Sequence, residues 1–473
     1  MSDEALFQRT SALALEYLAR LHERPVARPV EFSALLERLG GTLPAAGMAA
    51  GEVIEQLVTA VEPGLVATPG PRYFGFVTGG ALPVSVAADW LASAWDQNAF
   101  SFVISPAAAA VEEVVRIWLL ELLGLPSQMS MGLVTGGTMA NFTGLAAARH
   151  ALLKSVGWDV EADGLFGAPA LTVVTSDESH ISIFAALQML GLGRERVTRV
   201  ATDAQGRMRA DELSATLARI NTPVLVCAQA GNVNTGAFDP LSEIVPLVRA
   251  RLPHQPGWLH VDGAFGGWVA ASEQYRALVT QLDQADSFSV DCHKWLNVPY
   301  DSGLVFVSDR AAHYAAMTLS AAYYVPSPDE VRDNHNWVPE ASRRARCFAL
   351  YAALRALGRH GVANIVEHCC HLARRFAERL AADPQVRILN DVVINQVLVR
   401  FVNGGNDREA DDALTAEVMR RVQQDGTCWA GGTTWQGQHA LRISVSNWST
   451  TESDIERSAK AILACLHESK SQR

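Results

Sequence analysis

One lysine in the sequence stands where a charged side chain is hard to accommodate. Lys294 follows directly on the strand-like run SFSVDCH and lies between His293 and Trp295. A lysine there either reaches solvent or is held in a dry site, where burial lowers the pKa of its amine and lets it attack a carbonyl group. The position therefore indicates covalent, nucleophilic chemistry.

Polar residues also follow other short apolar runs. His180 follows ALTVVTSDES, Asn232 follows PVLVCAQAG, and Asp262 ends GWLHVD. Because ligands of parallel sheets bind outside the carboxyl ends of the strands, we expect these side chains to converge with Lys294. Singly, each has an ordinary explanation as a cap or a loop residue, and His260 with Asp262 lacks a third ligand for a metal. Their repetition at consecutive strand ends favours one shared site.

These residue types together meet the needs of one cofactor, pyridoxal 5'-phosphate. Its aldehyde requires a lysine amine such as Lys294, and its pyridine nitrogen requires a carboxylate such as Asp262, which makes the ring an electron sink. Its phosphate requires backbone N–H groups at a helix start, as the Gly-Gly-Thr turn 136–138 offers. The fingerprints GxGxxG and GxxxxGK(S/T) are absent, which disfavours a nicotinamide-dependent or P-loop enzyme.

The surrounding sequence predicts an α/β fold with a mostly parallel central sheet. From residue 130 on, short apolar runs alternate with helical patterns, as in buried strands covered by helices on both faces. We expect an N-terminal helical segment at 1–84, a large α/β domain at 85–360 and a small C-terminal α+β domain at 361–473. The expected strands lie at 132–137, 170–177, 196–203, 223–231, 257–265, 286–295, 303–309, 385–389, 395–402 and 440–448.

Composition narrows the class of protein further. The 473 residues are 49% hydrophobic and 19% charged, with a net charge of −11, which argues against nucleic-acid and anionic-membrane partners. No uncharged apolar run is long enough to span a bilayer, and the acidic first ten residues lack the apolar core of a secretory signal. Seven cysteines without CxxC spacing fit reduced thiols. We therefore expect a cytoplasmic enzyme.

Several stretches resemble one protein family. HVDGAF (260–265) and DCHKWLNVPYDSG (291–303) are similar to the group II pyridoxal-phosphate-dependent decarboxylases, the aromatic-L-amino-acid/glutamate decarboxylase family of fold type I. The resemblance covers most of the chain and implies a homodimer in which the N-terminal segment packs on the partner subunit. Supporting stretches lie at 73–80, 98–113, 135–149, 176–182, 231–240 and 441–448.

The resemblance also implies roles for individual residues. Lys294 binds the cofactor covalently, Asp262 pairs with the pyridine nitrogen, and Ala264 and His180 contact the two ring faces. Asp291 departs from an ordinary phosphate site, because a carboxylate repels a phosphate dianion unless it acts through a neighbouring donor. The phosphate site comprises Gly137, Thr138, Asp291 and His293, with Asn232 near the cofactor; the substrate side comprises Phe76, Thr78, Gly79, Asn98, Phe100 and Phe102, some of them across the dimer interface.

A second departure concerns a loop at 323–340. The family's decarboxylases carry there a tyrosine that protonates the substrate α-carbon, and alignment on Trp337 places Asn334 at this position. Asparagine cannot act as a general acid in the same way. We expect His335, Tyr323 or Tyr324 to supply the proton, with some side flux to other products, and we expect residues 325–338 to be mobile without substrate.

The sequence therefore predicts a decarboxylase that converts an L-amino acid to an amine and CO₂. Phe100 and Phe102 favour an aromatic or apolar substrate, although Arg332, Arg343 or Arg344 could bind a distal carboxylate. The alternatives are an aldehyde synthase, an aminotransferase or a carbon–carbon lyase with the same cofactor. A catalytically silent paralogue is disfavoured by the intact lysine, carboxylate and histidine.

Overall fold

The computed structural model describes residues 1–251, 256–319, 327, 331–405 and 407–471. The chain forms two compact units, which we call the large and the small unit. The large unit comprises Gly79–His371 and Asn390–Gln396, and the small unit comprises Met1–Thr78, Leu372–Leu389 and Val397–Arg473. Most of the N-terminal and C-terminal segments thus belong to one unit, whereas the sequence pattern separates them.

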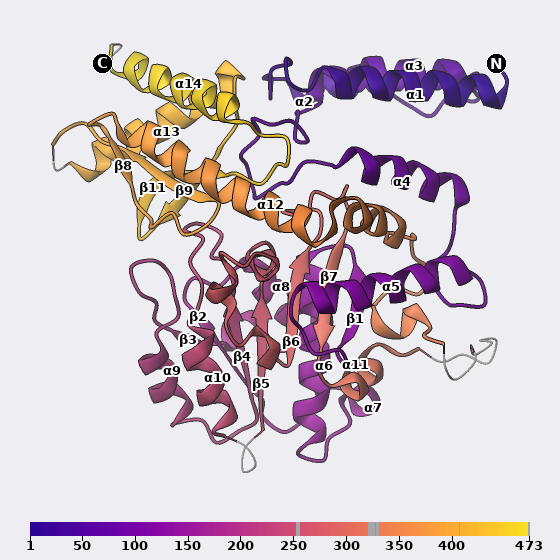
Figure 1. Ribbon diagram of the computed structural model, residues 1–473, viewed down its shortest axis with the longest axis vertical. Helices are drawn as coiled ribbons and strands as arrows, with labels where there is room; N and C mark the ends of the chain where they lie inside the picture. Colours follow the sequence, from indigo (N-terminus) through magenta and orange to yellow (C-terminus); the bar gives the residue numbers. More distant parts are fainter. Residues whose placement is uncertain (252–255, 320–326, 328–330, 406, 472–473) are drawn as a thin grey trace. The chain divides into compact units, whose positions relative to one another are not determined.

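The large unit is built on a seven-stranded sheet with the order β1-β7-β6-β5-β4-β2-β3 (Figure 1). Only β7 runs antiparallel to its neighbours, β1 and β6; the other neighbouring pairs are parallel. The mostly parallel α/β sheet predicted from the sequence is confirmed. The strands are β1 (Ser130–Val134), β2 (Thr172–Ser176), β3 (Thr198–Val200), β4 (Val224–Gln229), β5 (Gly257–Asp262), β6 (Ser287–Asp291) and β7 (Gly303–Val307).

Helices and short turns cover both faces of this sheet. α6 packs against β1, β5, β6 and β7, with α8 and α11 beside it. Ser287 and Ser289 of β6 reach the α6 side, so alternation directs Phe288 to the other face, where Gly267 of η3 (Gly266–Ala271) contacts it. The helices are α4 (Pro83–Trp95), α5 (Pro106–Leu122), α6 (Gly137–Lys154), α7 (Val160–Asp163), α8 (Ile181–Met189), α9 (Ala210–Leu217), α10 (Leu241–Arg249), α11 (Arg310–Met317) and α12 (Cys347–Ala381).

The small unit contains a four-stranded sheet with the order β10-β11-β9-β8. α13 packs on β11 and against α14. The sequence pattern misses β10, because GGTTW has two glycines and no apolar alternation. Among the described residues, no helix is both long and apolar enough to cross a membrane. The elements are α1 (Asp3–Ala19), α2 (Phe32–Leu39), α3 (Ala50–Val61), β8 (Val386–Ile388), β9 (Gln396–Phe401), α13 (Arg408–Asp425), β10 (Gly431–Trp435), β11 (Gln438–Ser444) and α14 (Glu452–Ser471).

Candidate active site

Lys294 lies just beyond the carboxyl end of β6. Its Nζ is 2.9 Å from Oδ2 of Asp291, the last residue of that strand. The backbone of Gly79 lies directly on Lys294, since a Cβ at position 79 would be only 1.8 Å from the Lys294 carbonyl oxygen. Beside it, the N–H of Gly80 donates to Oδ1 of Asn297 at 2.6 Å. The lysine backbone is therefore held from both sides.

The ionisation of Lys294 differs from the prediction. Burial lowers the pKa of Lys294, but the charge of Asp291 and its hydrogen bond outweigh this effect and raise the pKa above its ordinary value. The prediction of a lowered pKa is wrong because it considered burial alone. The positive charge of Lys294 also neutralises the Asp291 carboxylate. This removes the expected repulsion between that carboxylate and the cofactor phosphate.

His293 and the turn before α6 complete this side of the site. Burial lowers the pKa of His293, and its Nε2 lies 3.7 Å from Oδ1 of Asp291, a buried atom without a hydrogen-bond partner. A Cβ at Gly136 would be 2.8 Å from Cε1 of His293, and one at Gly137 would be 2.9 Å from Oδ2 of Asp291. Only glycines allow this approach, which brings the first turn of α6, with the exposed Thr138, beside the β6 residues.

Asp262 ends β5, the strand next to β6, and its carboxylate receives only hydrogen-bond donors. Oδ2 accepts from Nδ2 of Asn141 at 2.9 Å and from Oγ of Ser182 at 3.4 Å, and Oδ1 accepts from the N–H of Ala264 at 3.1 Å. The carbonyl of Ala264 accepts from the N–H of Asp291 at 2.8 Å. This bond ties the ends of β5 and β6 together. Because a carboxylate only accepts hydrogen bonds, the three donors hold the Asp262 side chain in a fixed orientation.

His180 and Asn232 occupy the loops after β2 and β4. The His180 ring caps α8, with Nδ1 2.7 Å from Oγ of Ser182, so one hydroxyl connects it to Asp262. Oδ1 of Asn232 accepts from the N–H groups of Asn234 and Thr235 in its own turn, and its Nδ2 donates to the carbonyl of Glu178 at 3.4 Å. His180 therefore joins the Asp262 cluster, whereas Asn232 organises its own turn and ties it to the loop after β2.

Three of the expected substrate-side residues form a separate cluster within the large unit. Oδ1 of Asn98 accepts from the N–H of Arg343 at 3.0 Å. The ring of Phe100 stacks on His335 with centroids 4.1 Å apart, and the N–H of Phe102 donates to Oδ1 of Asp333 at 3.0 Å. This cluster thus joins the 98–102 segment to the predicted loop.

The described part of that loop is packed within the large unit, and its mobility without substrate stays a prediction. Asn334–Trp337 form a 3-10 turn, η6, in which Asn334, His335 and Trp337 are buried. The stack on Phe100 and the hydrogen bond from the N–H of His335 to its carbonyl, at 2.9 Å, hold the turn in place. Tyr323 and Tyr324 lie outside the described residues. The role of His335 as a proton donor stays a prediction.

Phe76 and Thr78 belong to the small unit, and Gly79 is the first residue of the large unit. Phe76 and Val77 have φ angles of 54° and 57°, which side chains other than glycine rarely adopt. The Phe76 ring is exposed and lies 5.4 Å from the ring of Trp429. The substrate-side role of Phe76, Thr78 and Gly79 stays a prediction.

The three arginines considered for a distal carboxylate all have other partners. Nη1 of Arg343 is 2.9 Å from Oε1 of Glu112, and both side chains are buried. Arg332 donates to the carbonyl of Met131 and lies over the ring of Trp337. Nη2 of Arg344 is 2.7 Å from Oδ1 of Asp89. These guanidinium groups hold the fold together.

The sequence did not single out the residues that surround Asp262. Asn141 and Ser182 contact its carboxylate, and His260 and Ser289 contact Asn141. A usable signal existed for His260, because it lies two residues before Asp262 on one strand and so faces the same side of the sheet. Asn141 lies four residues after Gly137 in α6, and helical spacing puts it on the face of the N-terminal turn.

These residues fit pyridoxal phosphate. The glycine turn brings the start of α6 against Asp291 and His293, the Asp262 carboxylate is fixed by donors alone, and the Lys294 amine pairs with Asp291. When bound, the cofactor supplies an electron sink for bond cleavage at the substrate α-carbon. With the cofactor bound, Nζ of Lys294 would be the nucleophile toward its aldehyde, and the ion pair with Oδ2 of Asp291 favours the protonated form of this amine.

Comparison with known proteins supports the same assignment. Residues 35–402 match the family described as the pyridoxal-dependent decarboxylase conserved domain. The aromatic-L-amino-acid decarboxylase of Bacillus atrophaeus is 26% identical over 466 residues, which cover 96% of this chain and 94% of that protein. The L-2,4-diaminobutyrate decarboxylase of Rhizobium meliloti is 31% identical over 392 residues, 80% and 75% of the two chains. The crystal structure of Oryza sativa TDC with PLP and tryptamine has a TM-score of 0.91 at 22% identity and covers 98% of this chain and 97% of that chain.

The fold and the lysine–carboxylate site define a fold type I, pyridoxal-phosphate-dependent enzyme. Since the family match spans most of the sequence, the chain belongs to the pyridoxal-dependent decarboxylase family. It is an amino-acid decarboxylase whose cofactor is pyridoxal phosphate, as the sequence predicted.

Proposed function

We propose that the substrate is an L-amino acid without a distal carboxylate, with an aromatic or apolar side chain. The observation that carries this proposal is the use of Arg332, Arg343 and Arg344 by the fold. Arg343 is buried against Glu112, so freeing its guanidinium would leave an unpaired buried carboxylate, a cost of about 3–5 kcal/mol. An aromatic or apolar side chain requires no such cation.

A screen of the proteinogenic amino acids for CO₂ release tests the substrate class, with L-2,4-diaminobutyrate added because of the 31% identical relative. We expect the highest kcat/KM for an aromatic or apolar amino acid. A preference for glutamate, aspartate or diaminobutyrate would contradict the proposal. Borohydride reduction followed by peptide mapping should place the cofactor on Lys294, and an adduct on Lys154 would overturn the site itself.

A second outcome of the reaction is favoured by Asn334. Its side chain is buried at 1% exposure, and within the described part of the chain neither its amide oxygen nor its amide nitrogen has a hydrogen-bond partner. An amide cannot donate a proton to a carbanion. We infer that control of protonation is weaker than in the tyrosine-bearing decarboxylases, so that some turnovers end as aldehyde or as pyridoxamine phosphate.

Product analysis tests this second inference. Amine, aldehyde and pyridoxamine phosphate are measured together for the wild type and for Asn334→Tyr, His335→Ala, Tyr323→Phe and Tyr324→Phe. We expect Asn334→Tyr to raise the amine fraction. If the wild type forms amine alone and all four variants match it, these residues have no role in the fate of the carbanion.

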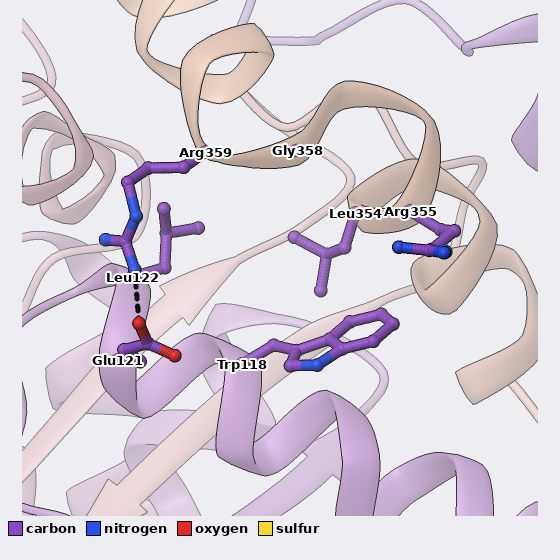
Figure 2. Close-up of a pocket in the computed structure, with 7 residues that line it drawn as sticks. All are labelled: Trp118, Glu121, Leu122, Leu354, Arg355, Gly358 and Arg359. Atoms are coloured by element: carbon purple, nitrogen blue, oxygen red, sulfur yellow. Dashed lines mark hydrogen bonds and ion pairs between the residues drawn. The ribbon is translucent and has the colours of Figure 1, made fainter.

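We also propose that the protein is a homodimer. The support is apolar surface on α4, α5 and their connection, a concentration that is unusual on a monomer. A hollow of about 190 Å³ at α5 and α12 is lined by the half-buried Trp118 and the buried Leu354. Figure 2 shows these side chains beside the Arg359–Glu121 ion pair. The exposed residues are Trp90, Leu91, Trp95, Val103, Ile104, Val114 and Ile117.

Light scattering at assay concentration should give the mass of two chains, and Ile117→Glu should lower it together with activity. An active monomer would refute the proposal.

We further propose a cytoplasmic location, because all seven cysteines are buried free thiols, as in reducing compartments. Fractionation that places the native protein in an oxidising compartment would contradict this.

A further inference from the structure

A chain of buried side chains runs from Asp262 into the core behind it. Nδ2 of Asn141 donates to Asp262, and Oδ1 of Asn141 is 2.9 Å from Nε2 of His260. Nδ1 of His260 is 2.8 Å from Oγ of Ser287, which in turn accepts from Nε1 of Trp258 at 2.9 Å. All five side chains are at least nine-tenths buried, and Asn141, His260 and Ser287 are fully so.

The chemistry of these groups fixes the direction of every hydrogen bond. The Asp262 carboxylate only accepts hydrogen bonds, so Nδ2 of Asn141 faces it and Oδ1 of Asn141 faces His260. The ring proton of His260 is therefore on Nε2, which donates to Oδ1 of Asn141. Nδ1 of His260 is then an acceptor and receives the proton of the Ser287 hydroxyl, which itself accepts from the Trp258 indole.

Two further observations support a neutral, oriented imidazole. Burial lowers the pKa of His260 to about 4, although the charge of Asp262 opposes this effect. Gly144, seven residues after Gly137 in α6, lets the helix approach the ring, because a Cβ there would lie 3.1 Å from both Cε1 and Nδ1 of His260. Oδ1 of Asn141 also accepts from Oγ of Ser289 at 2.6 Å.

We propose that Asn141 is a positioning residue for Asp262, held in its productive amide orientation by His260 and Ser287. With Oδ2 engaged by Asn141 and Ser182, Oδ1 of Asp262 accepts only the N–H of Ala264 and is the oxygen that has capacity for the pyridine nitrogen. Asn141 thereby adjusts how strongly the site recognises that nitrogen. The inference rests on the assignment of Asp262 to the cofactor ring.

The test measures recognition of the ring nitrogen without using turnover. Apoenzyme is titrated with pyridoxal phosphate and with its 1-deaza analogue, in which a C–H group replaces the ring nitrogen, and the ratio of the two dissociation constants is compared between variants. Asn141→Leu removes the side-chain hydrogen bonds to Asp262, Ser182, His260 and Ser289 at similar volume. Asn141→Asp keeps the shape but places a carboxyl group beside Asp262. Asn447→Leu is the matched control, since Asn447 is equally buried and its Nδ2 donates to the carbonyls of Pro69 and Gly70.

We expect the wild type to prefer pyridoxal phosphate, and both Asn141 variants to reduce this preference roughly tenfold, the value of one hydrogen bond to a charged group. Asn447→Leu should lower thermal stability and leave the preference unchanged. If the Asn141 variants lose affinity equally for both compounds, Asn141 is a structural residue and the inference is overturned. If the wild type itself shows no preference, the role of Asp262 fails and the inference fails with it. Asn141→Asp keeps the test available if Asn141→Leu does not fold.

Discussion

The close approach of Gly79 to Lys294 makes one substitution informative. A Cβ at position 79 would lie 1.8 Å from the Lys294 carbonyl oxygen, 2.9 Å from its carbonyl carbon and 3.3 Å from the carbonyl oxygen of His293. Real Cβ contacts essentially never fall below 3.0 Å, so in Gly79→Ala the two backbone segments must separate by roughly an ångström. The displaced atoms belong to the residue that carries the nucleophile.

A misplacement of this size at a reacting group reduces turnover about a hundredfold. Initial rates of CO₂ release should show this loss mainly in kcat, and borohydride trapping should show a lower fraction of cofactor on Lys294. Gly41→Ala is the matched control, because a Cβ at position 41 meets nothing within 4 Å. Wild-type kcat and full trapping in a folded Gly79→Ala protein would refute the role assigned to this contact.

Three further results are expected. Asp262→Asn should keep the fold and reduce kcat on the order of a thousandfold, and near-normal turnover would leave Asp262 as a structural residue. Asp291→Asn should lower the pKa of Lys294, because the carboxylate raises it; the pH dependence of lysine modification in the apoenzyme should then move to lower pH. Burial raises the pKa of Asp239 from 3.8 to about 7, although the N–H groups of Met208 and Gln229 oppose it. The native state therefore keeps a proton on Asp239 that the unfolded chain loses. The contribution of this group to the free energy of unfolding is fully present below pH 3.8 and is lost as the pH rises through about 7. Asp239→Asn should flatten this part of the slope in urea unfolding, and an unchanged slope would contradict it.

The sheet and its strand-end residues could be predicted because local pattern determines them. Buried strands such as β4 and β7 read as nearly continuous apolar runs. The rule that ligands bind at the carboxyl ends of parallel strands brought Lys294 and Asp262, beyond and at the ends of the paired strands β6 and β5, together. The raised pKa of Lys294 could not be predicted, because it depends on the distance to Asp291, which the strand end determines in three dimensions. The order of η6 depends likewise on the stack of His335 on Phe100, 235 positions away.

Asn141 illustrates a different limit of the sequence. It is a polar residue on a helix that is buried on most of its faces, so no periodic pattern of polar and apolar residues distinguishes it from its neighbours. Its partners are on β5 and β6, more than a hundred residues later, and each is itself an ordinary buried polar residue. Only the arrangement of these residues in space shows that the Asn141 amide nitrogen faces Asp262.

The one antiparallel strand of the seven-stranded sheet has a consequence for how the protein is made. Gly303 of β7 pairs with Val134 on one side and with Asp291 on the other, so β1 and β6 are joined in the sheet through β7. During synthesis the glycine turn after β1 leaves the ribosome long before β7, since Ser130 and Val307 are 177 residues apart. Loop closure of that length is slow relative to local helix formation. A nascent chain can therefore complete its N-terminal helices early, but it cannot take up cofactor until β7 has joined the sheet.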